Sequence, residues 1–303
     1  MESSVQNSTA AVVQPSWHCP ICSAPHSPSN ILFTLQWPEG PVDYFRCSCG
    51  MRYSSYAVKK SAPNPYDDSY YEHTRYAEDK SRMAYVSHLA EFFDTVLNQA
   101  MPSARVAMDV GCATGDFVAW LLKHGWNAHG MDISEAAVNK GRARGLPLKA
   151  AGIEELFHTP NQYDVITLWD VLEHVSDTKR TLAAIHTALK PGGFFLFKTV
   201  SCISVIEKMA EALYRLSGGR IAGPLKRMYV SCHLYFYTPD GLKRLLEQEG
   251  WTVLHTIQTD TPPAALFRSK LMRIAFHGIS ALHRICNRNY ELLMACRKPS
   301  TGI

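Results

Sequence analysis

Short apolar runs alternate with amphipathic stretches along the middle third of the chain. Runs with the length and composition of buried strands occupy residues 106–110, 127–131, 148–150, 163–168 and 193–199. Between them, apolar side chains recur at helical spacing over residues 116–124, 135–144 and 178–189. This alternation predicts right-handed βαβ crossovers and a parallel sheet.

The pattern continues toward the C-terminus. Thr238-Pro239-Asp240 predicts the start of a helix, because Thr can cap a helix and Pro fits its first turn. Two further strands are expected over residues 251–257 and 290–296, which brings the strand count to seven. The sequence therefore predicts an α/β fold with a Rossmann-like seven-stranded sheet and no internal repeat.

The N-terminal part of the chain has a different composition. Residues 1–16 are polar and predict a flexible tail. Residues 17–56 combine cysteines, prolines and aromatic residues, with strand-like pieces at residues 31–36 and 44–47. We expect this part to form a small separate module.

The rest of the chain divides into a connecting segment and a main domain. Residues 57–104 predict a linker and N-terminal lid helices, including an amphipathic helix over residues 79–99. The main domain is expected over residues 105–303. Two stretches that interrupt it, residues 202–237 and 258–288, are predicted to be insertions that cover an acceptor.

Composition narrows the class of protein. Of 303 residues, 46% are hydrophobic and 19% charged, which is typical of a globular chain. A net charge of +4 is too small to predict nucleic-acid binding, and no apolar run is long enough to span a bilayer. Residues 1–16 lack the basic start and apolar core of a secretory leader. Four of nine cysteines cluster early, which favours one metal site and a cytoplasmic location.

The early cysteines have the spacing of a metal site. Cys19 and Cys22 form one pair, Cys47 and Cys49 the other, with 24 residues between the pairs. Four thiolates make the closed tetrahedral shell of structural Zn²⁺, and metal binding would supply folding energy to a module with few aliphatic residues. The second pair is Cys-x-Cys, so His18 or His26 as a ligand, or four unligated thiols, remain alternatives.

A glycine-containing turn follows the first predicted strand of the main domain. Asp109 ends an apolar run, Gly111 and Gly115 frame the turn, and a helix follows. In a doubly wound sheet, the ligand crevice lies at the carboxyl ends of the strands, so this turn lines the crevice. The phosphate-binding patterns Gly-x-Gly-x-x-Gly and Gly-x-x-x-x-Gly-Lys-Ser/Thr are absent, which counts against NAD and ATP.

A second acid ends the next predicted strand. Asp132 follows Asp109 by one strand–helix–strand unit, and a carboxylate there can accept hydrogen bonds from both hydroxyls of a ribose. As alternatives, Gly111 and Gly115 are ordinary turn residues and Asp132 is a helix cap. The order of the three features favours a nucleoside pocket.

These segments resemble a known family. The runs Asp109–Gly115, Leu168–Val175 and Lys190–Gly193, together with Asp132, resemble successive motifs of class I S-adenosylmethionine (SAM)-dependent methyltransferases. The resemblance is close over residues 105–200. The run His233–Leu242 resembles a block in one subgroup that carries an N-terminal cysteine ribbon. That subgroup often acts on small molecules, sugars or lipid-linked intermediates.

The resemblance assigns the methionine and ribose of SAM to particular residues. Gly111, Cys112 and Gly115 would line the methionine moiety, and Asp109 would hold its amino group directly or through another group. Asp132 would bind the ribose.

The resemblance also implies contacts for the adenine and the donor methyl. Ile133 would pack on the adenine ring, with Ile153 and Glu154 at its edge. The family often has an acid where Gly152 stands, which leaves the contact to the adenine amino group open. Trp169 would close over the donor methyl together with Asp170, although Trp169 as an ordinary core residue is an alternative.

Methyl transfer from a sulfonium is an in-line displacement that needs alignment of the reacting atoms and, for a hydroxyl acceptor, a base. His174 follows Asp170 by one helical turn, and His233 precedes the helix that begins near Pro239. His174, His233 and Asp170 are therefore the candidate catalytic residues. The tyrosines at 70, 71 and 76 are further candidates, because the N-terminal segment of the family commonly folds over the donor.

The leading functional hypothesis is methylation of a small-molecule, sugar or lipid-linked intermediate. The alternative is a zinc-ribbon rRNA methyltransferase, but residues 17–56 contain only Arg46 and Arg52 as cations, fewer than a phosphate-binding module needs. A non-catalytic scaffold is a third hypothesis, against which the intact glycines and Asp132 argue. Residues 264–288 are basic and amphipathic, which allows peripheral membrane contact, but an ordinary surface helix packed on the sheet is the favoured interpretation.

Overall fold

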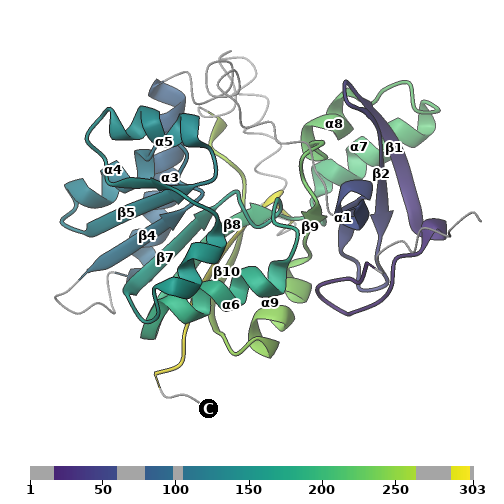
Figure 1. The fold of residues 1–303 in the computed structure, drawn as a ribbon. Coiled ribbons are helices and arrows are strands. Elements are labelled where there is room, and N and C mark those ends of the chain that lie inside the picture. Colours follow the sequence, from purple (N-terminus) through teal and green to yellow (C-terminus); the bar gives the residue numbers. More distant parts are fainter. Residues whose placement is uncertain (1–16, 60–78, 98–104, 264–287, 301–303) are drawn as a thin grey trace, which may run out of the picture.

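The computed structural model describes residues 17–59, 79–97, 105–263 and 288–300 (Figure 1). Its main sheet has seven strands in the order β10-β11-β8-β7-β4-β5-β6. The strands are β4 (Val106–Val110), β5 (Asn127–Asp132), β6 (Leu148–Ala150), β7 (Tyr163–Trp169), β8 (Leu189–Val200), β10 (Thr252–Thr259) and β11 (Glu291–Arg297). Strands β6, β5, β4, β7 and β8 run parallel, whereas β11 is antiparallel to both β8 and β10. The predicted Rossmann-like seven-stranded sheet is confirmed.

Helices cover both faces of this sheet (Figure 1). They are α3 (Asp79–Leu97), α4 (Asp116–Lys123), α5 (Glu135–Arg142), α6 (Thr178–Ala188) and α9 (Pro239–Gln248), with the 3₁₀ turn η3 (Ile153–His158). The predicted start of α9 is confirmed, because the Thr238 hydroxyl accepts a hydrogen bond from the Gly241 amide.

Alternating side chains along the strands supply two separate cores. On β8, Phe194 and Leu196 belong to the cluster that includes α3 and α4, whereas Phe195 and Phe197 belong to the cluster that includes α6 and α9. Period-2 alternation sends neighbouring residues to opposite faces, so a central strand covered on both sides must be apolar at nearly every position. This explains the continuous apolar runs in the sequence.

One boundary differs from the expectation. The helix predicted over residues 178–189 ends at Ala188, and β8 begins at Leu189 instead of Gly193. Leu189 pairs with Tyr163, and the register shifts before Phe194 pairs with Val165. The Pro-Gly-Gly segment is therefore an irregularity within β8, where Gly192 adopts a φ of 78°.

The N-terminal residues form a second sheet of four strands, on the right in Figure 1. Its strands are β1 (Ile31–Trp37), β2 (Gly40–Arg46), β3 (Arg52–Ser54) and β9 (Tyr235–Phe236), accompanied by the 3₁₀ turn η1 (Pro28–Asn30) and helix α1 (Ser55–Lys59). Strand β9 comes from the insertion predicted over residues 202–237, as do α7 (Val205–Leu216) and α8 (Gly223–Met228). Two segments far apart in sequence thus share one sheet.

Apolar packing joins these two segments closely. The N-terminal module, residues 17–56, is called the ribbon below. Its Phe33 and Tyr44 contact Tyr229, which follows α8, at ring-centroid distances of 4.9 and 5.1 Å. On the other side of β9, Tyr237 pairs with Ser201 beyond the end of β8. The segment around β9 therefore connects the small sheet to the large one.

A buried ion pair reinforces the connection. Nη1 of Arg52 on β3 lies 2.8 Å from Oε1 of Glu207 on α7, and the two side chains are 7% and 1% exposed. Arg52 also donates to Glu211 and to the Tyr229 hydroxyl. Burial raises the pKa of the Glu207 carboxyl to about 7, and the Arg52 charge opposes that shift.

Several expectations concern residues outside the described ranges. These are the tail at 1–16, the tyrosines at 70, 71 and 76, and the basic stretch, of which residues 264–287 are not described. Among the helices that are described, none is both long and apolar enough to cross a membrane.

The Arg52 ion pair predicts a large stability effect. We expect Arg52→Ala to lower the free energy of unfolding in urea by about 3–5 kcal/mol, because it leaves the Glu207 carboxylate buried without its partner. Arg46→Ala, on the adjacent strand but exposed, is the matched control and should change stability by less than about 0.5 kcal/mol. Equal effects of the two substitutions would contradict this account of the interface.

Candidate functional site

The turn after β4 has a backbone that requires glycine. Gly111 adopts a φ of 73°, and a Cβ placed there would lie 2.2 Å from Cγ2 of Val171. The amides of Gly111 and Cys112 both donate to the Met131 carbonyl on β5, at 2.8 and 3.0 Å. Gly115, with a φ of 82°, caps the N-terminus of α4. The turn is thus held tightly against β5 with bare backbone at the carboxyl edge of the sheet.

Asp132, at the end of β5, contacts this turn directly. Its Oδ2 accepts a hydrogen bond from the Ala113 amide, and its Oδ1 accepts one from the Ser134 amide, both at 2.8 Å. The α5 helix is capped by the Ser134 hydroxyl, which accepts from the Ala137 amide. Capping by Asp132 is therefore not needed, and its carboxylate is oriented by the turn.

A cavity opens beside the turn. It is lined by the following residues: Arg82, Tyr85, Val86, Leu89, Asp109, Gly111, Cys112, Ala113, Thr114, Asp116, Phe117 and Trp169. Four residues predicted to hold the donor are among them: Asp109, Gly111, Cys112 and Trp169. Trp169 is 7% exposed and packs edge-on against Phe117 at 5.2 Å, so it belongs to both the core and the cavity wall.

Asp109 is the most deeply buried acid of the cavity. It is 2% exposed, and its Oδ1 accepts a hydrogen bond of 2.6 Å from the Thr167 hydroxyl. Burial raises the pKa of the Asp109 carboxyl to about 7; the Thr167 hydrogen bond opposes that shift, and the nearby Asp132 adds to it. A carboxylate in such an apolar setting favours a cationic partner.

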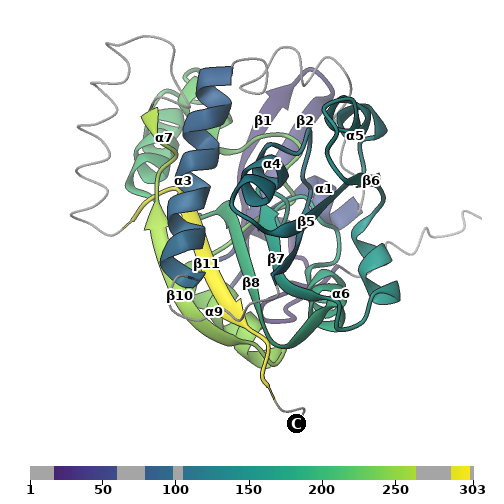
Figure 2. The same cartoon turned by 90° about the vertical axis from the view of Figure 1, so that its left-hand side faces the viewer.

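Helix α3, which crosses the sheet in the view of Figure 2, also lines the cavity. It contributes Arg82, whose Nε lies 3.5 Å from Oδ2 of Asp116, and Tyr85. The sequence predicted this helix but did not single out either residue. Both residues could have been noticed in the sequence, because a polar and an aromatic side chain one helical turn apart interrupt the apolar face of this helix.

A buried network of charges adjoins the cavity. Asp170 has a φ of 56° and accepts a hydrogen bond of 2.6 Å from the Tyr85 hydroxyl. Its other oxygen lies 2.8 Å from Nζ of Lys198, which is 1% exposed and also contacts Glu291 at 2.9 Å. The sequence indicated Asp170 as a candidate but not Lys198. A lysine within an apolar strand does not reveal which distant acids it will contact in the folded chain.

The residues predicted for the adenine lie outside the cavity lining. Ile133 is 65% exposed just beyond β5, Glu154 is exposed and Ile153 partly buried in the 3₁₀ turn η3. Their roles stay predictions.

The two candidate catalytic histidines contact each other and are not part of the cavity lining. The ring centroids of His174 and His233 lie 4.6 Å apart with perpendicular planes. Nδ1 of His174 is 3.1 Å from the Cys232 carbonyl oxygen, and burial lowers the pKa of His174 to about 4. Asp170 is the better-placed candidate, because its carboxylate accepts the hydrogen bond from Tyr85, which lines the cavity.

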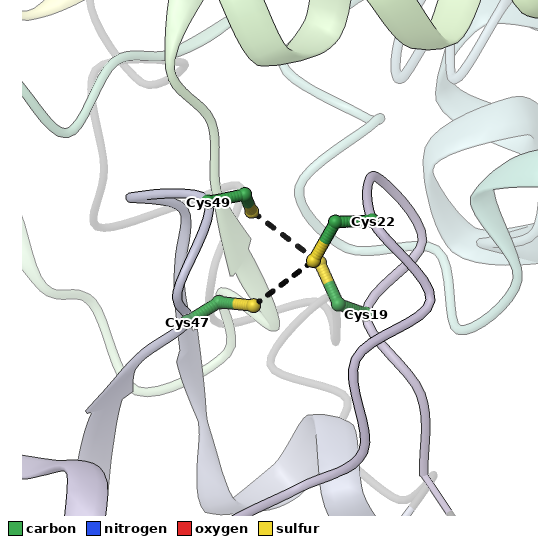
Figure 3. A group of neighbouring side chains, drawn as sticks. All are labelled: Cys19, Cys22, Cys47 and Cys49. Carbon is green, nitrogen blue, oxygen red and sulfur yellow. Dashed lines mark hydrogen bonds between the residues drawn. The ribbon is translucent and has the colours of Figure 1, made fainter.

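The four early cysteines converge (Figure 3). Cys19 and Cys22 lie in the turn before β1, and Cys47 and Cys49 lie between β2 and β3. Their sulfur atoms all lie within 4.8 Å of one another, with Cys19–Cys49 at 3.7 Å and Cys22–Cys47 at 3.4 Å. His26 contacts the Tyr53 hydroxyl instead and is not part of this cluster.

Curated proteins similar in sequence carry one recurring name. The chain is 33% identical over 106 residues to the ubiquinone biosynthesis O-methyltransferase of Bordetella bronchiseptica, covering 33% of this chain and 44% of that protein. It is 29% identical over 153 residues to the protein of the same name from Coxiella burnetii, covering 48% and 63%. The chain thus spans only about half the length of these relatives.

Solved structures support the fold assignment. An S-adenosylmethionine-dependent methyltransferase from Mesorhizobium loti superposes with a TM-score of 0.50 at 20% identity, covering 70% of this chain and all of that one. One from Archaeoglobus fulgidus superposes with a TM-score of 0.51 at 16% identity, covering 77% of this chain and all of that one. These likenesses show a shared fold.

The family follows from a longer match. A family profile described as a methyltransferase domain matches residues 81–256, more than half of the chain. The match begins in α3 and includes the glycine turn, Asp132 and the Asp170 segment. The chain therefore belongs to the methyltransferase-domain family.

Proposed function

We propose that this protein transfers a methyl group from SAM to a small-molecule, sugar or lipid-linked biosynthetic intermediate. The observation that carries the proposal is the side-chain-free turn at Gly111, which Asp132 contacts through the Ala113 amide beside a cavity. Bare backbone next to an oriented carboxylate matches the needs of a nucleoside whose ribose donates two hydrogen bonds.

The cavity residues fit the charged methionine end of SAM. Both Asp109 and Arg82 line the cavity, where Asp109 would attract the ammonium group and Arg82 the carboxylate. Asp132 would take the ribose, Gly115 would keep the turn close, and Ile133 would gain burial by packing on adenine, with Ile153 and Glu154 at the edge. SAM supplies an electrophilic methyl group, and the protein contributes alignment and exclusion of water.

Asp170, together with Tyr85 and Lys198, is the group best suited to bind and deprotonate the methyl acceptor. Tyr85 and Lys198 fix both oxygens of Asp170 at the carboxyl end of β7, adjacent to Trp169 in the cavity wall. A carboxylate held in this way can orient an acceptor hydroxyl and take its proton. His174, one turn after Asp170, and His233, which contacts it, remain alternative candidates for the base.

The relatives favour a lipid-linked or small acceptor over RNA. The relatives described above are named for O-methylation in ubiquinone biosynthesis. The ribbon also lacks a cationic surface: of its two arginines, Arg52 is buried against Glu207 and only Arg46 is exposed. RNA recognition by the ribbon would need more exposed cations.

We propose structural Zn²⁺ at the cysteine cluster. A tetrahedral Zn²⁺ site with thiolate ligands has sulfur–sulfur distances of about 3.8 Å, close to those between the paired cysteines. None of the eight described cysteines forms a disulfide, which agrees with a reducing, cytoplasmic location.

Gly111→Ala tests the donor site. The new Cβ would collide with Val171 and strain a backbone with positive φ, so SAM affinity measured by calorimetry should fall about 10- to 100-fold. Gly125→Ala is the matched control, because Gly125 has a φ of 78° but open space around its Cβ position. Equal affinities for the two variants would exclude the Gly111 turn from the donor site.

SAM affinity should depend on pH through Asp109. Since the pKa of this carboxyl is about 7 in the ligand-free protein, lowering the pH below that value protonates it and removes the charge that attracts the ammonium group. We expect affinity to fall toward tenfold per pH unit below about pH 7. Asp109→Asn should flatten this profile; a residual slope would report Asp132, whose pKa burial also raises. An unchanged slope in Asp109→Asn would contradict the assignment.

Activity itself is tested with SAM labelled in the methyl group. The label should pass to hydroxylated polyprenyl aromatics or another small-molecule acceptor, and ribosomal RNA should remain unlabelled. Asp170→Asn should lower the rate by roughly 10²–10⁴ while leaving SAM affinity nearly unchanged, because it removes a base and not a donor contact. Labelled RNA would support the alternative function, rRNA methylation. Absence of SAM binding would contradict the assignment as a methyltransferase.

A further inference from the structure

A second group of metal-ligating side chains lies apart from the cysteine ribbon. One ring nitrogen of His174, one of His233 and the sulfur of Cys232 all lie within 4.8 Å of one another. His174 belongs to the turn after β7, whereas Cys232 and His233 precede β9 in the insertion. Two of the three residues thus come from a segment that reaches the sheet only in the folded chain.

Backbone contacts hold the two segments in register. The amides of Leu234 and Tyr235 both donate to the Glu173 carbonyl, at 2.8 and 3.3 Å. The two histidines are partly buried and Cys232 is 8% exposed, so the packing around them holds the three side chains in place. Little movement is required to bring three ligand atoms to one ion.

The hydrogen bond at His174 selects the tautomer that a metal needs. Nδ1 of His174 lies 3.1 Å from the Cys232 carbonyl oxygen, which can only accept, so Nδ1 carries the proton. Nε2 is then the ring nitrogen of His174 that can act as a metal ligand. A histidine that donates one ring N–H to a backbone carbonyl is the usual arrangement of a metal-ligating imidazole.

We propose that His174, Cys232 and His233 form a second metal site, which binds Zn²⁺ or a similar divalent transition metal. A thiolate and two imidazoles are the donor types that these ions prefer, and they disfavour Mg²⁺ and Ca²⁺. Three protein ligands leave a fourth position open for water or an oxygen of a bound molecule, unlike the closed four-cysteine set. This site lies one turn from Asp170, at the carboxyl end of β7.

Co²⁺ is the probe for this site, because its visible spectrum reports coordination and thiolate ligands. The full-length protein is purified with Zn²⁺, dialysed against a mild chelator that removes the ion from the open three-ligand site but not from the closed four-cysteine site, and then titrated with Co²⁺. The spectrum of Cys232→Ala, treated in the same way, is subtracted from that of the wild type. We expect a difference spectrum of a tetrahedral ion with a single thiolate, saturating at one equivalent. His233→Ala should abolish it as well, whereas Cys296→Ala, a buried cysteine on β11, should retain it.

Metal analysis after gel filtration provides an independent measurement. The wild type and Cys296→Ala should retain one more equivalent of Zn²⁺ than Cys232→Ala or His233→Ala. Thermal melting confirms that each variant is folded. No difference spectrum and equal metal content in the folded proteins would show that the three side chains only pack together. This result would leave the SAM assignment untouched, since SAM affinity is measured separately and does not depend on these residues.

Discussion

The turn after β4 must pass between β5 and the loop after β7 without a side chain. At Gly111 any Cβ would meet Val171, and the positive φ excludes most other residues on its own. Because the turn is this close, its amides reach the Met131 carbonyl and the Asp132 carboxylate. The shape of the cavity, the orientation of Asp132 and the start of α4 all depend on this one steric constraint.

Around the cavity, buried charges are arranged in complementary sets. Within the described part of the chain, the buried Asp109 accepts a side-chain hydrogen bond from a hydroxyl, whereas Asp170 is held by a lysine and a tyrosine. Nearby, burial raises the pKa of the Glu173 carboxyl to about 8, and the negative charge of Asp170 contributes to that shift. The three acids thus differ in their surroundings: burial raises the pKa of Asp109 and of Glu173, whereas Asp170 has a lysine and a tyrosine as partners.

The ribbon is integrated into the fold through the insertion. Strand β9 extends the ribbon sheet, and the Arg52–Glu207 pair and the aromatic cluster around Tyr229 join the ribbon to α7 and α8. The same insertion carries Cys232 and His233 to the end of β7. A zinc-stabilised ribbon would therefore act on the acceptor side indirectly, by fixing the position of this insertion.

The sequence by itself determined the periodic parts of the molecule and the local motifs. The spacing of apolar side chains reveals strands that are buried on both faces and helices with one apolar stripe, so the seven strands could be predicted. The Gly111 turn and the pairs Cys19/Cys22 and Cys47/Cys49 could be predicted because each is a short local motif. Contacts between distant segments carry no such local period. The tertiary structure alone decided that β9 pairs with β3, that Lys198 meets Asp170 and Glu291, and that Tyr85 enters the cavity. These depend on loop paths and on which buried charge finds a partner, and both are settled only when the whole chain packs.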